Sequence, residues 1–221
     1  MGSPVKTRRY DASRRKAASD RTRQRILEVA DAHLRQRGYA ETTVATIASS
    51  ADVHVDTVYA LVGKKVEIVH ELIELALSGS ENAVPAADRP YVAAIRAEPD
   101  PASKLALYAA ATCDMLARVA PLVAALRDAA GTDHTAAEIW RAFSDRRAHN
   151  MRAFVEDVAS VNGLRAGLDP DTAADTVWAT NSPEIYLMLT TERGWTPGQY
   201  EKWLEDTWIH LLLPAPITAQ A

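Results

Sequence analysis

Apolar residues recur every three or four positions along most of this chain, which is the period of a helix with one buried face. In the N-terminal part, the stretch Ile26–Leu34 carries such a stripe. The stripe predicts a helix that begins with Ser19 or Asp20 as its cap. We expect this helix to end at Gly38, because glycine readily takes the left-handed conformation that follows a helix.

Two short helices, separated by a turn of about four residues, are predicted next. The first follows Thr43, whose hydroxyl can cap it by accepting a backbone N–H. The second begins near His54, and a longer helix over residues 64–77 follows it. This order predicts a helix-turn-helix, whose second helix can enter the major groove of DNA. Short helical hairpins also occur in many other all-α proteins.

Prolines and caps divide the rest of the chain into further helices. Four prolines interrupt residues 78–101 and predict a loop-rich connector with one or two helical turns. Beyond it we expect helices over 102–119, 121–131 and 135–161, and then three that begin at Asp169-Pro170, Ser182-Pro183 and Thr196-Pro197. No stretch has the alternation of a strand. The prediction is an all-α protein, in which a three-helix module is joined by a bridging helix to a larger helical domain.

Charge is unevenly distributed, although the net charge is only −4. Residues 1–37 hold 11 Lys/Arg and 4 Asp/Glu, whereas the remaining residues hold 14 and 25. A basic end on an acidic body is typical of a polyanion-binding head on a separate module. Arg21, Arg23 and Arg25 lie early in a predicted helix, where the helix dipole disfavours cations, so an external anion would explain them. A solubilising arm is the alternative for the basic end.

The sequence contains no recognisable set of catalytic residues. The sequence has no Gly-rich phosphate loop, no GxSxG, no HExxH and no cysteine pair. Glu67-x-x-His70 is similar to half of a carboxylate–histidine metal site, but no second copy exists, and a solvated helix face explains it better. We therefore expect neither catalysis nor a metal, and no cofactor.

Location in the cell is predicted from three absences. The single cysteine, Cys113, cannot form an internal disulfide and is expected to be a core thiol. No apolar run approaches the roughly 20 residues that span a bilayer. The N-terminus lacks the apolar segment of a secretory signal. We expect a soluble cytoplasmic protein without membrane contact.

Several motifs around the helix-turn-helix together resemble the DNA-binding region of tetracycline-repressor (TetR) family regulators. The resemblance covers about residues 20–75 and is carried by Tyr39-Ala-Glu-Thr-Thr43, Ile47-Ala48, Asp52-Val53, Thr57-Val-Tyr59 and Gly63-Lys-Lys65-Val-Glu67. The basic residues 1–18 lack an apolar face and are predicted to form a flexible arm, and the change of texture near residue 78 predicts the end of a DNA-binding domain over 19–78 that includes the bridging helix. The resemblance implies that the remaining domain, over 79–221, binds an effector and dimerises. Asp52 stands where this family often has glycine.

Candidate DNA contacts follow from the resemblance and from the short length of the second helix. His54, Val55, Asp56 and Thr57 are placed to meet base edges, and Thr43, Tyr59 and Lys65 to meet phosphates. The complete set of candidates is Arg21, Thr43, Thr46, His54, Val55, Asp56, Thr57, Tyr59, Lys64 and Lys65. Two alternatives stay open: His54 and Asp56 can act only as helix caps, and Tyr59 only as a core aromatic residue.

The last two helices carry more bulky apolar residues than a terminal hairpin needs, and such an excess often indicates an interface. The resemblance implies a dimer, and its candidate residues are Ile185, Leu189, Tyr200, Leu204, Trp208 and Leu211. Closure of the monomer's own core is the alternative. A two-fold dimer would read a palindromic operator, with its recognition helices about one DNA turn apart.

An effector pocket is expected from the resemblance, between the inner faces of the C-terminal helices. Its candidate residues are Tyr108, Thr112, Met115, Trp140, Phe143, Arg147, Met151, Trp178 and Asn181. Arg147 and Asn181 are the most informative, because they are polar among apolar neighbours. The alternative for the aromatic residues is an ordinary core. We expect a largely hydrophobic ligand that releases a repressor from DNA.

A second class of function stays open on the sequence alone. The chain could be an all-α protein that binds a ligand or docks a partner and has no specific DNA target. Retention on heparin or random DNA with a steep salt dependence would favour the regulator, and no retention would favour the alternative.

Overall fold

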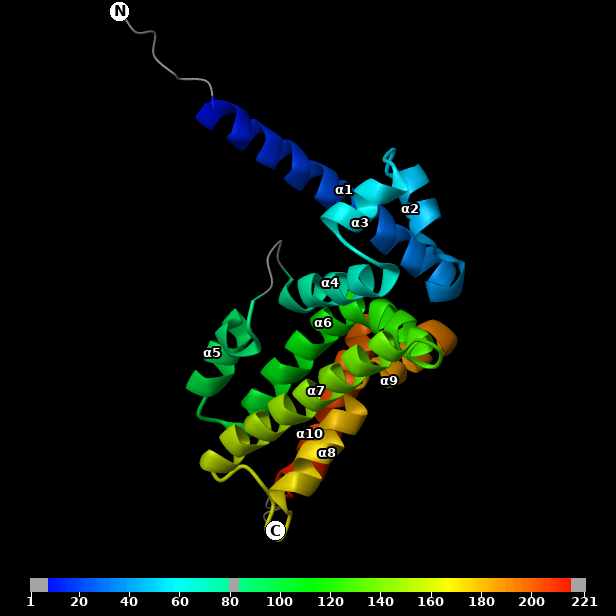
Figure 1. Cartoon of the computed structure of the whole chain (residues 1–221). Coiled ribbons are helices and arrows are strands. Elements are labelled where there is room, and N and C mark those ends of the chain that lie inside the picture. The colour runs from blue at the N-terminus through cyan, green and yellow to red at the C-terminus, as the bar shows by residue number, and fades with distance from the viewer. Residues whose placement is uncertain (1–7, 80–83, 216–221) are drawn as a thin grey trace, which may run out of the picture. The chain divides into compact units, whose positions relative to one another are not determined.

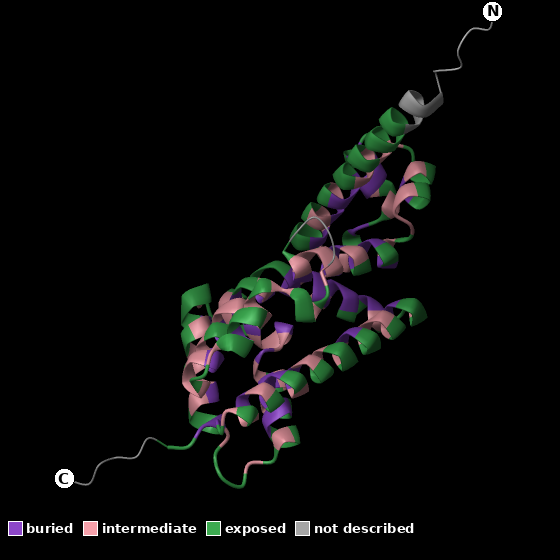
Figure 2. Cartoon of the chain, turned by 90° about the vertical axis from the view of Figure 1, so that its left-hand side faces the viewer, coloured by how far each residue is buried: buried purple, intermediate pink, exposed green. Residues whose placement is uncertain are grey.

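The computed structural model of the chain describes residues 8–79 and 84–215, and every regular element among them is a helix (Figure 1). The predicted all-α fold is confirmed. The chain divides into two compact units, residues 1–72 and 73–221, so the boundary falls inside one helix, α4 (Lys65–Ser78). In several helices of both units the buried residues gather on one side, as the apolar period predicts (Figure 2).

The first unit consists of α1 (Arg8–Glu41), α2 (Val44–Ser50), α3 (Val55–Leu61) and the first half of α4. Its core is formed by apolar side chains with less than a tenth of their surface exposed: Ile26, Leu27, Ala30, Leu34, Ile47, Ala48, Ala51, Val58, Val66, Ile68, Val69 and Leu72. Each fully buried Leu or Ile contributes about 1.5–3 kcal/mol. This small core holds α2 and α3 against α1.

Helix α1 begins earlier than its apolar stripe. A start at Ser19 or Asp20 was wrong, because the helix already begins at Arg8. Ala and Arg have high helix propensity, so residues 8–18 can extend a helix that is already nucleated, without an apolar face. Residues 1–7 of the predicted arm lie outside the described residues. At Gly38, where the sequence predicts the end of the helix, a non-helical φ of 74° kinks α1, and a short further segment continues to Glu41.

Local interactions fix the start of α2 and the turn that connects it to α3. The predicted cap is confirmed: the Thr43 hydroxyl accepts the backbone N–H of Thr46, and the Thr46 hydroxyl accepts that of Thr43. Asp52 has a φ of 52°, a conformation that costs most side chains energy but that Asp tolerates better. This backbone geometry is the reason why glycine also suits the position.

The second unit is a bundle of helices around α6. It contains the second half of α4 followed by η1 (Ala86–Asp88), α5 (Pro90–Ala97), α6 (Pro101–Ala130), α7 (His134–Ser160), α8 (Pro170–Thr180), α9 (Pro183–Leu187), the π-helical η2 (Met188–Glu192) and α10 (Pro197–Leu212). Helix α6 packs against α5, α7, α9 and α10, and α7 packs against α8. The short α5 confirms the helical turns predicted within the connector.

Helix α6 runs through Pro121 without a break, so the predicted end near residue 119 and restart at Pro121 were wrong. An internal proline removes one backbone hydrogen bond and costs about 3 kcal/mol or more. Burial on both sides of it offsets this cost, since Val119, Ala120, Leu122 and Val123 are almost fully inaccessible. By length and mean hydropathy α6 could span a membrane, but 56% of its most apolar window is buried inside the structure, as in a core helix.

The later helix starts follow their predicted caps. Side chains of Asp169, Ser182 and Thr196 accept backbone N–H groups at the starts of α8, α9 and α10. In each case proline occupies the first turn, where its missing N–H costs nothing. The caps and their prolines were therefore sufficient to locate these three helices.

Candidate nucleic-acid interface and effector cavity

Helix α3 presents an exposed face in the first unit. His54, Val55, Asp56 and Tyr59 are exposed, whereas Val58, on the opposite side, is completely buried. Thr57 is half-buried between the two faces. The buried residue anchors the helix, and the exposed side chains leave its outer face free to meet a partner.

The capping alternatives for this face can be compared with the structure. His54 occupies the cap position of α3, but its side chain makes no capping hydrogen bond. Asp56 lies in the first turn, where its carboxylate interacts favourably with the helix dipole. Tyr59 is 51% exposed, so the core alternative for this side chain is wrong. Of the two alternatives, only an electrostatic role of Asp56 in its own helix remains.

The basic residues of this unit separate into exposed and engaged groups. Arg21 and Lys64 are exposed. Arg23 instead donates through Nε to the Leu61 carbonyl at the end of α3, at 3.2 Å, and forms an ion pair with Glu71 of α4. The sequence argument that only an external anion would explain Arg23 was therefore wrong. Arg23 ties α1 to the ends of α3 and α4.

Lys65 is half-buried and packs on the residue that follows the α1 kink. Its ammonium donates to the Tyr39 carbonyl at 2.9 Å and lies 3.7 Å from the centre of the Tyr39 ring. Partial burial lowers the pKa of Lys65. Thr43 and Thr46 also have internal partners, since both hydroxyls belong to the capping box of α2. Any phosphate contact by these three residues would be added to these internal bonds.

The acidic face of α4 consists of separately paired carboxylates. Glu67 accepts the backbone N–H of Lys64 at 2.6 Å, Glu71 pairs with Arg23, and Glu74 pairs with Arg146. Within the described ranges, no group of three or more His, Cys, Asp or Glu side chains could hold a metal ion. Helix stability and ion pairing account for these carboxylates.

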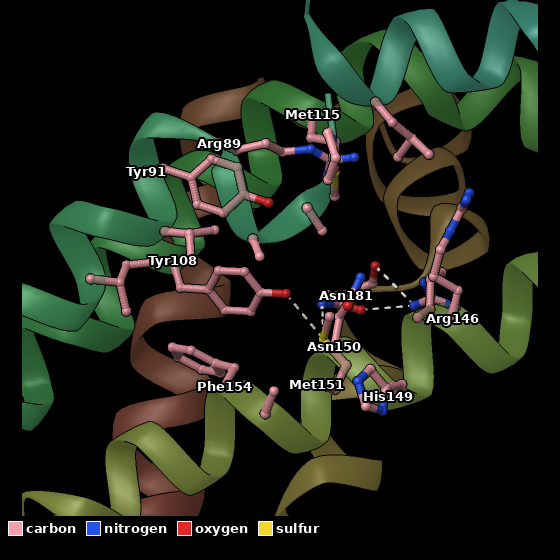
Figure 3. A pocket seen from close by; sticks show the side chains of 18 of the residues that line it. Arg89, Tyr91, Tyr108, Met115, Arg146, His149, Asn150, Met151, Phe154 and Asn181 are labelled. Carbon is pink, nitrogen blue, oxygen red and sulfur yellow. Dashed lines mark hydrogen bonds between the residues drawn. The ribbon is translucent and has the colours of Figure 1, made fainter. Parts of the chain in front are cut away.

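The second unit encloses a cavity of about 660 Å³, a size suited to a drug-sized ligand (Figure 3). Six predicted pocket residues line it: Tyr108, Met115, Phe143, Arg147, Met151 and Asn181. The other three, Thr112, Trp140 and Trp178, are not among its lining residues. Thr112 is buried on α6, and Trp140 stacks against Phe143 at 6.0 Å between ring centres.

Several lining residues were missed in the sequence. The most important are Arg89 and Tyr91, which come from the segment interpreted as a connector, and Glu74 and Leu77 of α4. Figure 3 shows Arg89 and Tyr91 on the same opening as Tyr108. A Pro-rich segment gives no sign of which domain face it will cover, so only the amphipathic period around Ile95 could have suggested this packing.

Polar groups converge on the middle of the wall. Arg147 donates through one nitrogen to the Trp178 carbonyl and to the Asn181 side-chain oxygen, both at 2.8 Å. The Asn181 amide donates to the Met151 sulfur at 3.0 Å, and the Tyr108 hydroxyl donates to the same sulfur at 3.1 Å. These bonds join α6, α7 and α8 in one network. Trp178 supports it from behind, with its ring 5.1 Å from the Arg147 guanidinium.

The predicted dimer residues differ in exposure. Tyr200, Leu204 and Trp208 have no exposed surface within the single chain. They are core residues: Trp208 donates to the Thr180 hydroxyl at 2.7 Å and stacks on the Tyr108 ring. Their assignment to a dimer surface is therefore wrong for this structure. An amphipathic pattern shows that a face is buried, but not whether the same chain or a second copy covers it.

Three of the predicted dimer residues keep accessible surface. Ile185 and Leu189 are half-buried, and Leu211 is 40% exposed. Met188, which the sequence argument did not select, is 46% exposed beside them in the chain. These positions remain available to a second copy.

Comparison with known proteins gives a family and a fold. Residues 26–72 match the family model described as bacterial regulatory proteins, tetR family. No curated protein matches the chain. Many solved structures share the fold, among them the fatty acid degradation regulator FadR of Bacillus halodurans, with a TM-score of 0.65 at 15% identity over 85% of this chain and 94% of that one.

Two further structures show the same agreement. A protein of Saccharomonospora viridis, assigned as a transcriptional regulator and solved in complex with choline, has a TM-score of 0.67 at 18% identity, over 89% of this chain and 100% of that one. The TetR family transcriptional regulator PfmR of Thermus thermophilus has a TM-score of 0.61 at 21% identity, over 86% and 99%. Residues 26–72, the helix-turn-helix region, are therefore similar to the tetR family of bacterial regulatory proteins, and the chain shares the fold of these solved structures.

Proposed function

We propose that this regulator is a sequence-specific DNA-binding repressor, and that a small, largely apolar effector releases it from a palindromic operator. The observation that carries the DNA-binding part is the outer face of α3, where His54, Val55, Asp56 and Tyr59 are exposed over a buried anchor at Val58. A short helix with polar ends and an apolar anchor is suited to reading base edges in the major groove. The protein acts in the cytoplasm and is not an enzyme.

Within this face the residues have different tasks. His54 donates to acceptors such as a purine N7, Val55 contacts a thymine methyl group, and Asp56 accepts from a cytosine amino group. Thr57 and Tyr59 lie beside them. The residues that approach phosphates are Arg21, Thr43, Thr46, Lys64 and Lys65. Lys64 is the stronger of the two lysine candidates, because it is exposed, whereas Lys65 is half-buried against Tyr39.

Effector control is supported by the cavity and by its link to α4. Glu74 and Leu77 line the cavity, and they belong to the same helix whose first half is part of the DNA-binding unit. Arg118 also holds the end of this helix, by donating to the Ala76 carbonyl at 3.1 Å. A ligand that moves α4 would change the spacing of two recognition helices in a dimer. The dimer surface is formed around Ile185, Leu189 and Leu211.

Selection from a random DNA pool tests the function directly. The protein is used to retain duplexes through several rounds at physiological salt, and the enriched sequences are aligned. We expect two inverted half-sites with centres about one helical turn apart, roughly 10 base pairs. Enrichment of no common sequence, or no retention on DNA at all, would contradict the proposal and favour an α-helical ligand-binding protein without a DNA target.

Light scattering at micromolar protein tests the dimer separately. A mass of twice the chain is expected from the palindromic site. A monomer at this concentration would contradict both the dimer and the operator symmetry, and Leu211→Glu should lower the dimer fraction without lowering the melting temperature of the monomer.

A further inference from the structure

The cavity of the second unit carries more positive charge than its own carboxylates balance. The charged residues that line it are Glu74, Arg89, Arg96, Arg146, Arg147 and Asp157. Glu74 is matched by Arg146, through contacts of 2.5 and 3.3 Å. Asp157 is matched by the fully buried Lys104, whose ammonium lies 2.7 Å from it. Arg89, Arg96 and Arg147 therefore have no carboxylate in the cavity lining that balances their charge.

Arg147, one of these three arginines, is half-buried on α7. Its hydrogen-bond partners are the two carbonyls and the side-chain amide oxygen at Trp178 and Asn181, all of them neutral. Burial lowers the pKa of Arg147, which expresses the cost of holding its charge away from water. Glu184 acts on it only through space, and Glu184 is itself paired with Arg127 at 2.5 Å.

Arg89 offers an unused donor. Its Nε–H is buried and has no hydrogen-bond partner among the described residues, and its terminal nitrogen lies 4.0 Å from the soft sulfur of Met115. A buried donor that makes no hydrogen bond loses free energy relative to water. Within the described part of the chain, neither Arg89 nor Arg147 forms an ion pair with a carboxylate.

Arg89 and Arg147 line the same cavity as Tyr108. Burial raises the pKa of Tyr108 far above its ordinary value, and the charges of Arg147 and Arg89 both act in the opposite direction on the same hydroxyl. Printed contacts connect Arg147 to Tyr108: Arg147 donates to the Asn181 side-chain oxygen, and the Asn181 amide and the Tyr108 hydroxyl both donate to the Met151 sulfur (Figure 3). Around this polar centre the wall is apolar, with Leu116, Val119 and Phe154 among its residues.

We propose that the effector of this protein is an amphipathic organic monoanion, a carboxylate on an apolar body, whose charge is held by Arg89 and Arg147 beside Tyr108. The inference rests on the proposed effector control and specifies the chemical class of the ligand. A carboxylate would give Arg89 its missing acceptor and would neutralise charge that burial makes costly. A quaternary ammonium ligand, such as the choline bound by the S. viridis protein, would meet positive charge here.

Three probes with the same alkyl chain test the class of ligand: decanoate, decanol and decyltrimethylammonium, each titrated calorimetrically below its micelle concentration. Decanoate is expected to bind at least about tenfold more tightly than decanol, and the ammonium probe most weakly, because a charge-assisted hydrogen bond is stronger than a neutral one. Equal binding of the three probes, tighter binding of decanol or of the ammonium, or no binding of any of them would overturn the proposal.

Substitutions of Arg89 then test whether its positive charge holds the carboxylate. Arg89→Gln should lose most of the preference for decanoate over decanol, whereas Arg89→Lys should retain it because the charge remains. Arg141→Gln is the matched control, since Arg141 is an exposed arginine on α7 outside the cavity lining. An unchanged preference in folded Arg89→Gln, judged by its melting curve, would overturn the role of Arg89.

DNA retention without ligand is measured on the same samples. Retention together with a failed probe series would leave the regulator standing and remove only the anionic class of effector. If the protein does not bind DNA but still prefers decanoate, the DNA-binding function is contradicted and the anionic class of ligand stands.

Discussion

The α3 face and the cavity are built in opposite ways. The α3 face comes from one short stretch, in which Thr43 and Asp52 set the local geometry and Val58 anchors the helix. The cavity is assembled from side chains on α4, α5, α6, α7 and the start of α9, far apart in the sequence. A site of the first kind can be recognised from a motif. A site of the second kind depends on packing, so a family resemblance cannot supply its residues.

The largest effect is expected from the packing on which the cavity depends. Trp208→Ala should lower the free energy of unfolding of the second unit by about 3–5 kcal/mol, because it leaves a large void and removes the bond to Thr180. Chemical denaturation followed by circular dichroism measures this change. His210→Ala, at an exposed position of the same helix, is the control and should change stability by less than about 0.5 kcal/mol.

If both substitutions lower stability only slightly, Trp208 is not a core residue, and its assignment to a dimer interface would again be the better interpretation.

The next effect separates the two regions functionally. Replacing His54 and Asp56 together by Ala should weaken binding to the selected operator by about 100-fold or more, since each base contact contributes about 1–3 kcal/mol of discrimination. Fluorescence anisotropy with a labelled duplex measures it. Binding of decanoate should not change, and stability should fall by no more than about 1 kcal/mol, through the lost interaction of Asp56 with the dipole of α3. If the double variant binds its operator as the parent does, the exposed face of α3 does not read the sequence.

Adjacent lysines provide a smaller and sharper comparison. Lys64→Ala should reduce the slope of log K against log salt by about one with unchanged stability, as expected for the loss of one phosphate contact. Lys65→Ala should instead destabilise the first unit by about 1 kcal/mol, because it removes a hydrogen bond and a cation–π contact with Tyr39. A reduced salt slope with full stability in Lys65→Ala would reverse these roles.

The smallest effect concerns the single cysteine of the second unit. Burial raises the pKa of Cys113 to about 11, from an ordinary value of 9.0. The folded state therefore keeps its proton when the unfolded state has lost it, so the free energy of unfolding falls as pH rises between about 9 and 11. Alkylation by iodoacetamide should be slow at neutral pH in the native protein. Fast alkylation there would show that the thiol is accessible and ionised.

The sequence predicted best the features that depend on residues close to one another in the chain. Gly38 and the caps Thr43, Asp169, Ser182 and Thr196 act on neighbours within a few residues, and all were located correctly. Six cavity residues were also found, because Arg147 and Asn181 are polar positions on otherwise apolar stripes and their neighbours share the same faces.

The errors concern contacts that are distant in the sequence. Arg23 was assigned to an external anion because Glu71 is far away along the chain, although it pairs with Arg23 in the fold. Arg89 was missed because a proline-rich segment does not reveal which wall it closes. Pro121 was expected to break α6, but the burial on both sides of it is a tertiary effect that a local rule cannot include.

The central claim is that the exposed face of α3 reads a DNA sequence, and one ratio tests it. The dissociation constant of the protein is measured by anisotropy for its selected duplex and for a scrambled duplex of the same composition, at physiological salt. The account predicts a ratio of about 10³ or more, as in specific protein–DNA complexes. A ratio near one would mean that only charge holds the protein to DNA, and would contradict the account.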